Sequence, residues 1–174
     1  MVPTVAQQLR ALSAALTKAV IPALDPNDGF AAEQAGLMLA TLNWILDVHE
    51  SEYPYEVVEN GEYRRLLVRL AELPVGLVDA ELETALKAAG GEGPPAGSEP
   101  PPLSALRSQT RRYKELAERA YTALAAGAPP EDAARARELV LDLARRQSRR
   151  EQSWFRMTGF PTDVEGDVAT VLAS

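Results

Sequence analysis

Residues 103–157 decide the fold, and they read LSALRSQTRRYKELAERAYTALAAGAPPEDAARARELVLDLARRQSRREQSWFRM. Apolar side chains recur every three or four positions on both sides of GAPP at 127–130. This spacing places them on one face of an α-helix. The segment therefore predicts a helical hairpin with helices over 103–126 and 131–157. The residues expected to face the rest of the protein are Leu106, Thr110, Tyr113, Ala117, Ala120 or Tyr121, Leu124, Ala133, Ala136, Val140, Leu143, Gln147, Trp154 and Met157.

The same spacing recurs before the hairpin and predicts helices over 4–20, 30–50, 57–73 and 78–89. Prolines separate these segments, because proline cannot continue a helix. The helix over 30–50 is apolar on nearly every side, which indicates that it is buried or shared between two subunits. We expect it to be the central helix of the fold.

Three breaks complete the expected outline. Tyr53-Pro54-Tyr55 is expected to end the apolar helix, and Thr162 is expected to cap a last short helix over about 163–172. The run GGEGPPAGSEPPP at 90–102 has the composition of a flexible linker. We therefore expect an all-α fold, an irregular helical bundle of six to seven helices. Its single domain would comprise N-terminal helices (1–89), the linker (90–102), the hairpin (103–157) and a tail (158–174).

Composition narrows the chemistry. Hydrophobic residues make up 46% and charged residues 25% of the chain, the balance of a globular protein. Cysteine is absent and His49 is the single histidine. Zinc and di-iron sites recruit several such ligands, so we expect no metal or other cofactor and assign no catalytic residue. There is no apolar run of the ~20 residues that a membrane span needs and no signal-like start, so we expect a cytoplasmic protein without a membrane partner.

Charge is unevenly distributed along the chain. Residues 1–60 hold two basic and eight acidic residues, whereas residues 104–156 hold twelve basic and seven acidic ones. Opposite charges of this kind favour an arrangement in which the two segments face each other, within one chain or between subunits. The alternative is that both are solvated faces.

The densest basic run is RRQSRR at 145–150. Arg146 and Arg150 are four residues apart and share a helix face, so they could clamp an anionic group between them. The other interpretation is pairing with the acidic N-terminal half. Nucleic acid is the least favoured partner, because the sequence pI of about 4.8 is the opposite of the usual basic footprint.

A ligand pocket between helices is one further hypothesis, with an anionic or acyl-CoA-type molecule held by arginine and walled by aromatic rings. His49 beside acidic neighbours could act in proton transfer there, or could simply satisfy the end of its helix. Aromatic residues at helical spacing are otherwise core residues. The candidate ligand-binding residues are Trp44, His49, Tyr53, Arg146, Arg150 and Trp154.

Residues 7–48 show an amphipathic helix, a Val/Ile-x-Pro-x-Leu break and a second helix that opens on phenylalanine. This pattern resembles a group of small helical bacterial proteins of unassigned function, which are encoded beside aminoglycoside-phosphotransferase-like and acyl-CoA-metabolising enzymes. The resemblance implies an accessory role near acyl-CoA or phosphoryl chemistry. Where the group has Arg-Glu near the end of the second helix, this chain has His49-Glu50. The residues that carry the pattern are Leu9, Leu16, Val20, Ile21, Pro22, Leu24, Phe30, Leu37 and Leu42.

Three functions follow from these features. The first is a non-enzymatic accessory or interaction protein that acts as a homo-oligomer or binds a partner enzyme, because the apolar helix and the long hairpin offer more apolar surface than one small chain easily covers. The alternative is a bundle that binds an anionic small molecule. This alternative extends to an enzyme that acts on the bound molecule. Nucleic-acid binding is the third.

Overall fold

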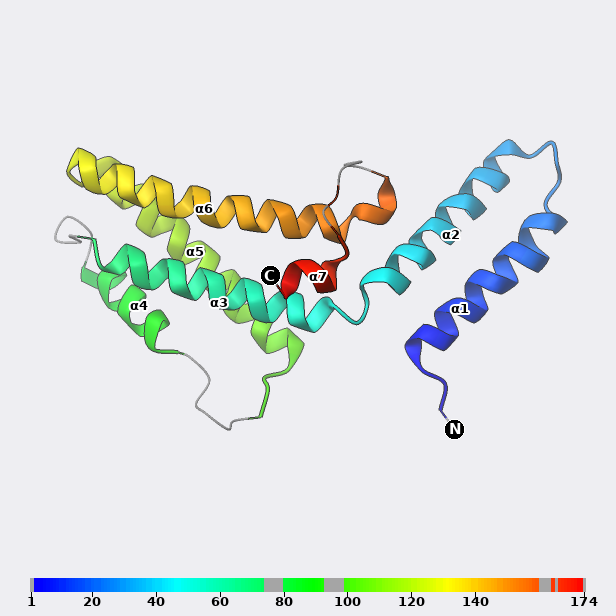
Figure 1. Cartoon of the computed structure of the whole chain (residues 1–174), viewed down its shortest axis with the longest axis horizontal. Helices are drawn as coiled ribbons and strands as arrows, with labels where there is room; N and C mark the ends of the chain where they lie inside the picture. Colours follow the sequence, from blue (N-terminus) through cyan, green and yellow to red (C-terminus); the bar gives the residue numbers. More distant parts are fainter. Residues whose placement is uncertain (1, 74–79, 93–98, 160–163, 165, 174) are drawn as a thin grey trace. The chain divides into compact units, whose positions relative to one another are not determined.

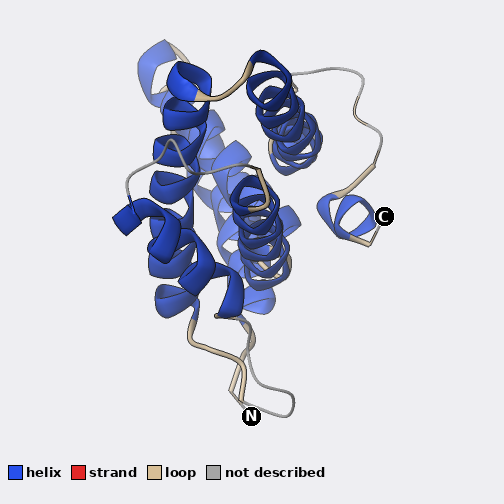
Figure 2. Cartoon of the chain, turned by 90° about the vertical axis from the view of Figure 1, so that its left-hand side faces the viewer, coloured by secondary structure: helices blue, strands red, loops and turns tan. Residues whose placement is uncertain are grey.

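The computed structural model describes residues 2–73, 80–92, 99–159, 164 and 166–173. Within these ranges the chain forms seven α-helices and no strand (Figures 1 and 2). The predicted all-α helical bundle is therefore confirmed. The chain divides into two compact units, one made of residues 1–52 and 150–174 and the other of residues 53–149.

The unit of residues 53–149 contains the main hydrophobic core. Its helices are α3 (Glu52–Ala71), α4 (Ala80–Gly91), α5 (Leu103–Gly127) and most of α6 (Pro130–Trp154). All four contribute buried side chains to one cluster, because each carries apolar residues at helical spacing. The fully or almost fully buried members include Leu67, Leu70, Leu86, Ala89, Tyr113, Ala120, Leu124 and Ala136.

The predicted hairpin is formed by α5 and α6. The expected inward residues of α5, from Leu106 to Leu124, are buried. Pro130 begins α6 and acidic residues follow in its first turn, where the helix dipole favours negative charge. The second helix ends at Trp154 rather than at Met157, because Arg156–Thr158 form a tighter 3₁₀ turn, η3.

Two predicted helix boundaries are wrong. Tyr53-Pro54-Tyr55 does not end the preceding helix but lies in the first turn of α3. Proline is tolerated there because the N–H groups of a first turn have no acceptor within the helix, so the N–H that proline lacks is not missed. Gly90 and Gly91 belong to α4 rather than to the linker, and a Cβ at Gly90 would lie 2.9 Å from Val68 Cγ2 of α3. That close approach explains why a glycine continues the helix here.

Two further predictions fall on residues outside the described ranges, and one concerns the last helix. The start predicted for α4 near 78 and the Thr162 cap lie outside them. The last helix, α7 (Val168–Leu172), is shorter than the predicted 163–172 and is capped by Asp167, whose side chain accepts from the Thr170 N–H. The boundary between the compact units does not follow the 90–102 linker, since α4 packs on α5.

The other unit is built around a second helical hairpin. It comprises α1 (Val5–Ala15), the π-helical turn η1 (Leu16–Val20), the 3₁₀ turn η2 (Ile21–Ala23) and α2 (Gly29–Val48). Helices α1 and α2 lie side by side (Figure 1). The predicted helix over 4–20 is therefore present, but its last turn is widened before Pro22 enters the 3₁₀ turn.

Candidate functional site

The α1–α2 hairpin is held in shape by side-chain caps at both helix starts. Thr4 and Gln7 form a reciprocal capping box, in which the Gln7 N–H donates to Thr4 Oγ1 at 3.2 Å and the Thr4 N–H donates to Gln7 Oε1 at 2.9 Å. Asp28 caps α2 by accepting from the Ala31 N–H at 2.9 Å. The hairpin is therefore made of two separately defined helices rather than of a frayed extension.

These two helices bury very little. No residue of α1 is buried, and only Ala35 and Val48 of α2 are buried. The prediction that the apolar helix is the buried centre of the fold is therefore wrong for the single chain. Helix α1 packs against α2, and all the other residues of the two helices are exposed or half-buried.

Large apolar side chains consequently face solvent along the hairpin. Phe30 is 72% exposed and Leu37 is 55% exposed, although both are among the most hydrophobic side chains. Contiguous exposed apolar residues on a folded protein mark interaction sites or liabilities for aggregation. We define the hairpin surface as the exposed residues Val5, Leu12, Phe30, Leu37 and Met38.

The charges on the hairpin are few and segregated. Arg10 and Lys18 are the only charged residues between positions 4 and 24, whereas α2 carries only the acids Glu33 and Asp47. Among the described residues, Arg10, Lys18 and Glu33 form no ion pair, and all three are exposed. Positive charge is therefore confined to residues 4–24 of the hairpin, and the charges of α2 are negative.

The far end of α2 packs against the segment that follows α6. The indole N–H of Trp44 donates to the Trp154 carbonyl at 2.9 Å, and the Trp44 ring stacks on Phe155 with 6.0 Å between ring centroids. A satisfied indole and an offset aromatic pair are typical of a structural anchor. This contact brings together two of the predicted ligand-binding residues, Trp44 and Trp154.

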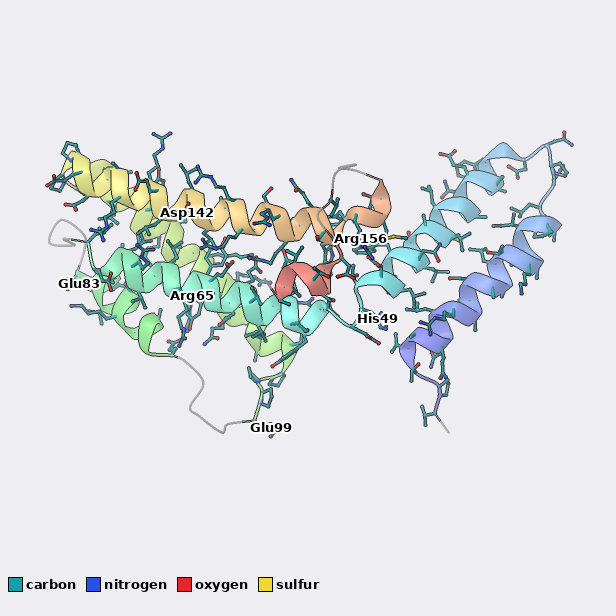
Figure 3. The ribbon with its side chains drawn as sticks, viewed as in Figure 1. His49, Arg65, Glu83, Glu99, Asp142 and Arg156 are labelled. Atoms are coloured by element: carbon teal, nitrogen blue, oxygen red, sulfur yellow. The ribbon has the colours of Figure 1, made fainter. Side chains whose placement is uncertain are left out.

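An ion pair reinforces the anchor. Arg156, which is labelled in Figure 3, donates from Nε to Asp47 Oδ2 at 2.9 Å and from one terminal nitrogen, Nη2, to Asp47 Oδ1. Hydrogen bonding to Asp47 raises the pKa of Arg156 above its ordinary value. Hydrogen bonding from Thr170 lowers the pKa of Asp167, the cap of α7. Asp47 is thus engaged within its own unit, unlike Glu33.

The other predicted ligand-binding residues have structural partners. His49 Nδ1 lies 3.0 Å from the Leu46 carbonyl oxygen and Nε2 lies 3.8 Å from Glu50 Oε1, as expected of a histidine that satisfies a helix end. The Tyr53 hydroxyl donates to the Pro101 carbonyl at 3.1 Å. Their role in binding a ligand stays a prediction.

The two arginines of the predicted clamp differ in environment. Arg146 Nε donates to Glu62 Oε1 at 2.8 Å, and the Glu62 side chain is only 6% exposed. Arg150 is buried and is 4% exposed. Arg146 therefore already pairs with a carboxylate of its own chain, and an anionic ligand would have to share this guanidinium with Glu62.

Several basic residues of the α5–α6 hairpin pair with acids of α3. Besides Arg146 with Glu62, Lys114 Nζ lies 2.9 Å from Glu59 Oε1, and Arg107 Nε lies 3.0 Å from Glu56 Oε1. Glu56 and Glu59 belong to the acidic segment 1–60, so its predicted meeting with the basic segment within one chain is observed at these two residues, and Glu62 lies just beyond it. The Tyr63 hydroxyl extends the network to Gln147, which also donates to Glu59.

A shallow cavity of about 330 Å³ lies between α4 and α5. Three alanines, Leu116 and four charged residues line it. None of the predicted ligand-binding residues lines it. The lining residues are Ala85, Ala88, Ala89, Glu92, Arg112, Glu115, Leu116 and Arg119.

Comparison with known proteins found no relative of this chain. No protein-family model, no curated protein and no solved structure matches this chain. In the described part of the chain, no three acidic or histidine side chains are grouped so as to hold a metal ion. None of the described helices combines the length and hydropathy of a membrane span.

Sequence reasoning did not assign the hairpin surface as the site. One signal for it was present, because residues 5–48 contain only six charged side chains. Apolar periodicity alone could not show which of these residues face solvent, since a helix that is apolar all round has no single inward side. The six charged residues are Arg10, Lys18, Asp25, Asp28, Glu33 and Asp47.

Proposed function

We propose that this protein is a non-enzymatic helical accessory protein that acts by association through the hairpin surface. The single observation that carries the proposal is the exposure of Phe30, Leu37 and their neighbours on two well-capped helices. Each such side chain gains about 1.5–3 kcal/mol when it is fully removed from water, so a partner that covers several of them gains a large driving force.

In this proposal the two units have different roles: residues 53–149 form a stable core, and the α1–α2 hairpin provides the surface for association. The unit of residues 53–149 has its own core and ion-pair network, so its stability does not depend on covering the hairpin. We infer that the exposed apolar side chains of the hairpin serve a partner. A role beside an acyl-CoA-metabolising or phosphotransferase-like enzyme, which the resemblance of residues 7–48 implies, is compatible with a protein of this kind.

Site-specific photo-cross-linking in the cell tests this function. A benzophenone amino acid replaces Leu37 in one variant and Leu141 of α6 in the matched control; both leucines are exposed, at 55% and 43%. We expect the probe at position 37 to form a defined protein adduct and the probe at 141 to form none. Equal labelling at the two positions, or no adduct at position 37, would overturn the proposal.

The small-molecule alternative has weaker support. Arg146 is engaged by Glu62, and His49 Nδ1 lies against the Leu46 carbonyl. The cavity between α4 and α5 involves neither residue. No contact in the described residues favours a ligand over a protein partner, and the low sequence pI stands against nucleic acid.

A further inference from the structure

We propose that the cavity between α4 and α5 binds a small organic acid, with the carboxylate of the acid on Arg119 and its apolar body on the alanines of α4. The cavity lies in the unit of residues 53–149, so it shares no residue with the hairpin surface and does not depend on the proposed function. It also involves none of the ligand-binding residues predicted from the sequence.

An ion pair at one end of the cavity shows how the two helices are aligned. Arg112 of α5 pairs with Glu92, which follows α4, and the Glu92 carboxylate also accepts from the Tyr113 hydroxyl at 3.2 Å. The helices run antiparallel (Figure 1), and the Tyr113 hydroxyl lies 3.5 Å from the Ala89 carbonyl oxygen. Residues 92 and 112 therefore face each other across the cavity.

A second arginine occurs two turns further along α5, with no carboxylate opposite it. Arg119 is seven residues after Arg112, and Ala85 is seven residues before Glu92. Seven residues span about 10.5 Å of helix axis, so the same step along both antiparallel helices places Ala85 opposite Arg119. Both residues line the cavity. The carboxylate that Glu92 provides for Arg112 is thus replaced by a methyl group at the position opposite Arg119.

The Arg119 guanidinium is available to a ligand. Arg119 is exposed and forms no ion pair with any residue that the structure describes. Glu115 lies one turn before it on the same helix and also lines the cavity, but these two side chains do not pair in the described structure. A guanidinium binds a carboxylate through two parallel hydrogen bonds, so a carboxylate is the group that Arg119 is best suited to accept.

The walls beside Arg119 suit an apolar body of limited size. Ala85, Ala88 and Ala89 recur at helical spacing on α4, and the same alignment of the helices places Leu116 opposite Ala88. Alanine leaves space that a larger side chain would fill, and the cavity has a volume of about 330 Å³. Small-molecule sites begin at about 300 Å³. The ligand is therefore a carboxylate with a short hydrocarbon chain or a single ring.

Titration of the full chain with hexanoate, followed by ¹H–¹⁵N correlation NMR, tests the proposal. We expect the largest chemical-shift changes at residues 85–92 and 112–119 and a dissociation constant in the millimolar range, since so small a ligand has few atoms with which to bind. Hexanol lacks the carboxylate and acetate lacks the chain, so each should bind at least about fivefold more weakly. Hexyl phosphate tests the alternative anion. If it binds at least about fivefold more tightly than hexanoate, the assignment of a carboxylate is overturned.

Variants of the two facing positions provide a second readout. Arg119→Gln should raise the dissociation constant for hexanoate at least about fivefold. Arg111→Gln is the matched control and should leave the constant unchanged, because Arg111 is exposed on the same helix, lies outside the cavity lining and forms no ion pair within the described ranges. Circular dichroism checks that both variants remain helical.

Substitution of Ala85 tests the missing carboxylate directly. Ala85→Glu places a carboxylate of the chain itself opposite Arg119 and should raise the dissociation constant for hexanoate at least about fivefold. Ala85→Gln adds a side chain of the same size without the charge, so it should weaken binding less. Equal weakening by the two substitutions would mean that Arg119 does not hold the carboxylate.

Three further results would overturn the proposal. They are the absence of shift changes at residues 85–92 and 112–119, equal binding of hexanoate and hexanol, and unchanged affinity in Arg119→Gln. The cross-linking experiment at position 37 is unaffected by any of them. Failure of the carboxylate site and failure of the proposed function are therefore distinguishable.

Discussion

At the scale of single residues, Tyr113 shows how one buried polar group is satisfied in this fold. The residue has no exposed surface, yet its hydroxyl lies 3.5 Å from the Ala89 carbonyl and 3.2 Å from Glu92 Oε2. Arg112 pairs with the same Glu92 carboxylate. Burial, together with the negative charge of Glu92, raises the pKa of the Tyr113 hydroxyl above its ordinary value of 10.0.

This raised pKa predicts a loss of stability in alkali. Above pH 10 the unfolded chain releases the Tyr113 proton while the folded chain still holds it, so the free energy of unfolding falls as pH rises through the folded-state pKa. Tyr113→Phe has no proton to release at this position. We therefore expect urea denaturation to show a smaller fall between about pH 9 and about pH 11 in the variant than in the wild type. Parallel falls would contradict the assignment.

At the scale of secondary-structure elements, the helices differ in what surrounds their glycines. Gly61 in α3 has open space where a Cβ would be, whereas Gly90 in α4 lies against Val68 of α3. Glycine costs a helix interior about 0.5–1 kcal/mol relative to alanine. The two positions therefore separate helix propensity from interhelical contact.

The pair predicts opposite responses to the same substitution. Gly61→Ala should raise the free energy of unfolding by about 0.5–1 kcal/mol, because the added methyl group meets nothing. Gly90→Ala should show none of this gain, because Val68 must shift to admit the methyl group. Urea denaturation of both variants measures the difference. Equal gains at the two sites would mean that α4 does not approach α3 as closely as the structure shows.

At the scale of the whole molecule, the charge pattern of the sequence becomes a set of ion pairs with very different exposure. Arg146 pairs with Glu62, which is almost fully buried, while Arg145 pairs with Asp142 on an exposed helix face. An exposed pair contributes little to stability, whereas the loss of one partner leaves a buried carboxylate poorly compensated. Arg145 and Arg146, which are neighbours in the same basic run, are therefore expected to contribute unequally to the free energy of unfolding.

This difference predicts that Arg146→Ala lowers the free energy of unfolding by about 1–2 kcal/mol, with half-exposure of the arginine reducing the full cost of breaking a buried pair. Arg145→Ala, its matched control, should change the value by less than about 0.5 kcal/mol. Chemical denaturation near neutral pH measures both. If Arg146→Ala changes the free energy of unfolding as little as the control does, the pair with Glu62 is not needed for stability. That result would favour the hypothesis that Arg146 and Arg150 clamp an anionic ligand.

The positions of the helices could be predicted from the sequence to within a few residues. The inward residues of α5, such as Tyr113 and Leu124, were identified because helical periodicity is a local property of the chain. Helix ends were less predictable. Pro54 fits the first turn of α3 as readily as a break, and Gly90 extends α4 because of its contact with α3.

The sequence by itself determined that this protein is helical, that α5 and α6 form a hairpin, and that residues 5–48 are unusually poor in charge. Only the tertiary structure decided that Phe30 and Leu37 face solvent and that Arg146 belongs to Glu62. The physical reason is that periodicity depends on neighbours three and four residues away, whereas burial depends on which distant surface covers a side chain. An apolar helix such as α2 has the same sequence pattern whether its cover comes from its own chain or from another.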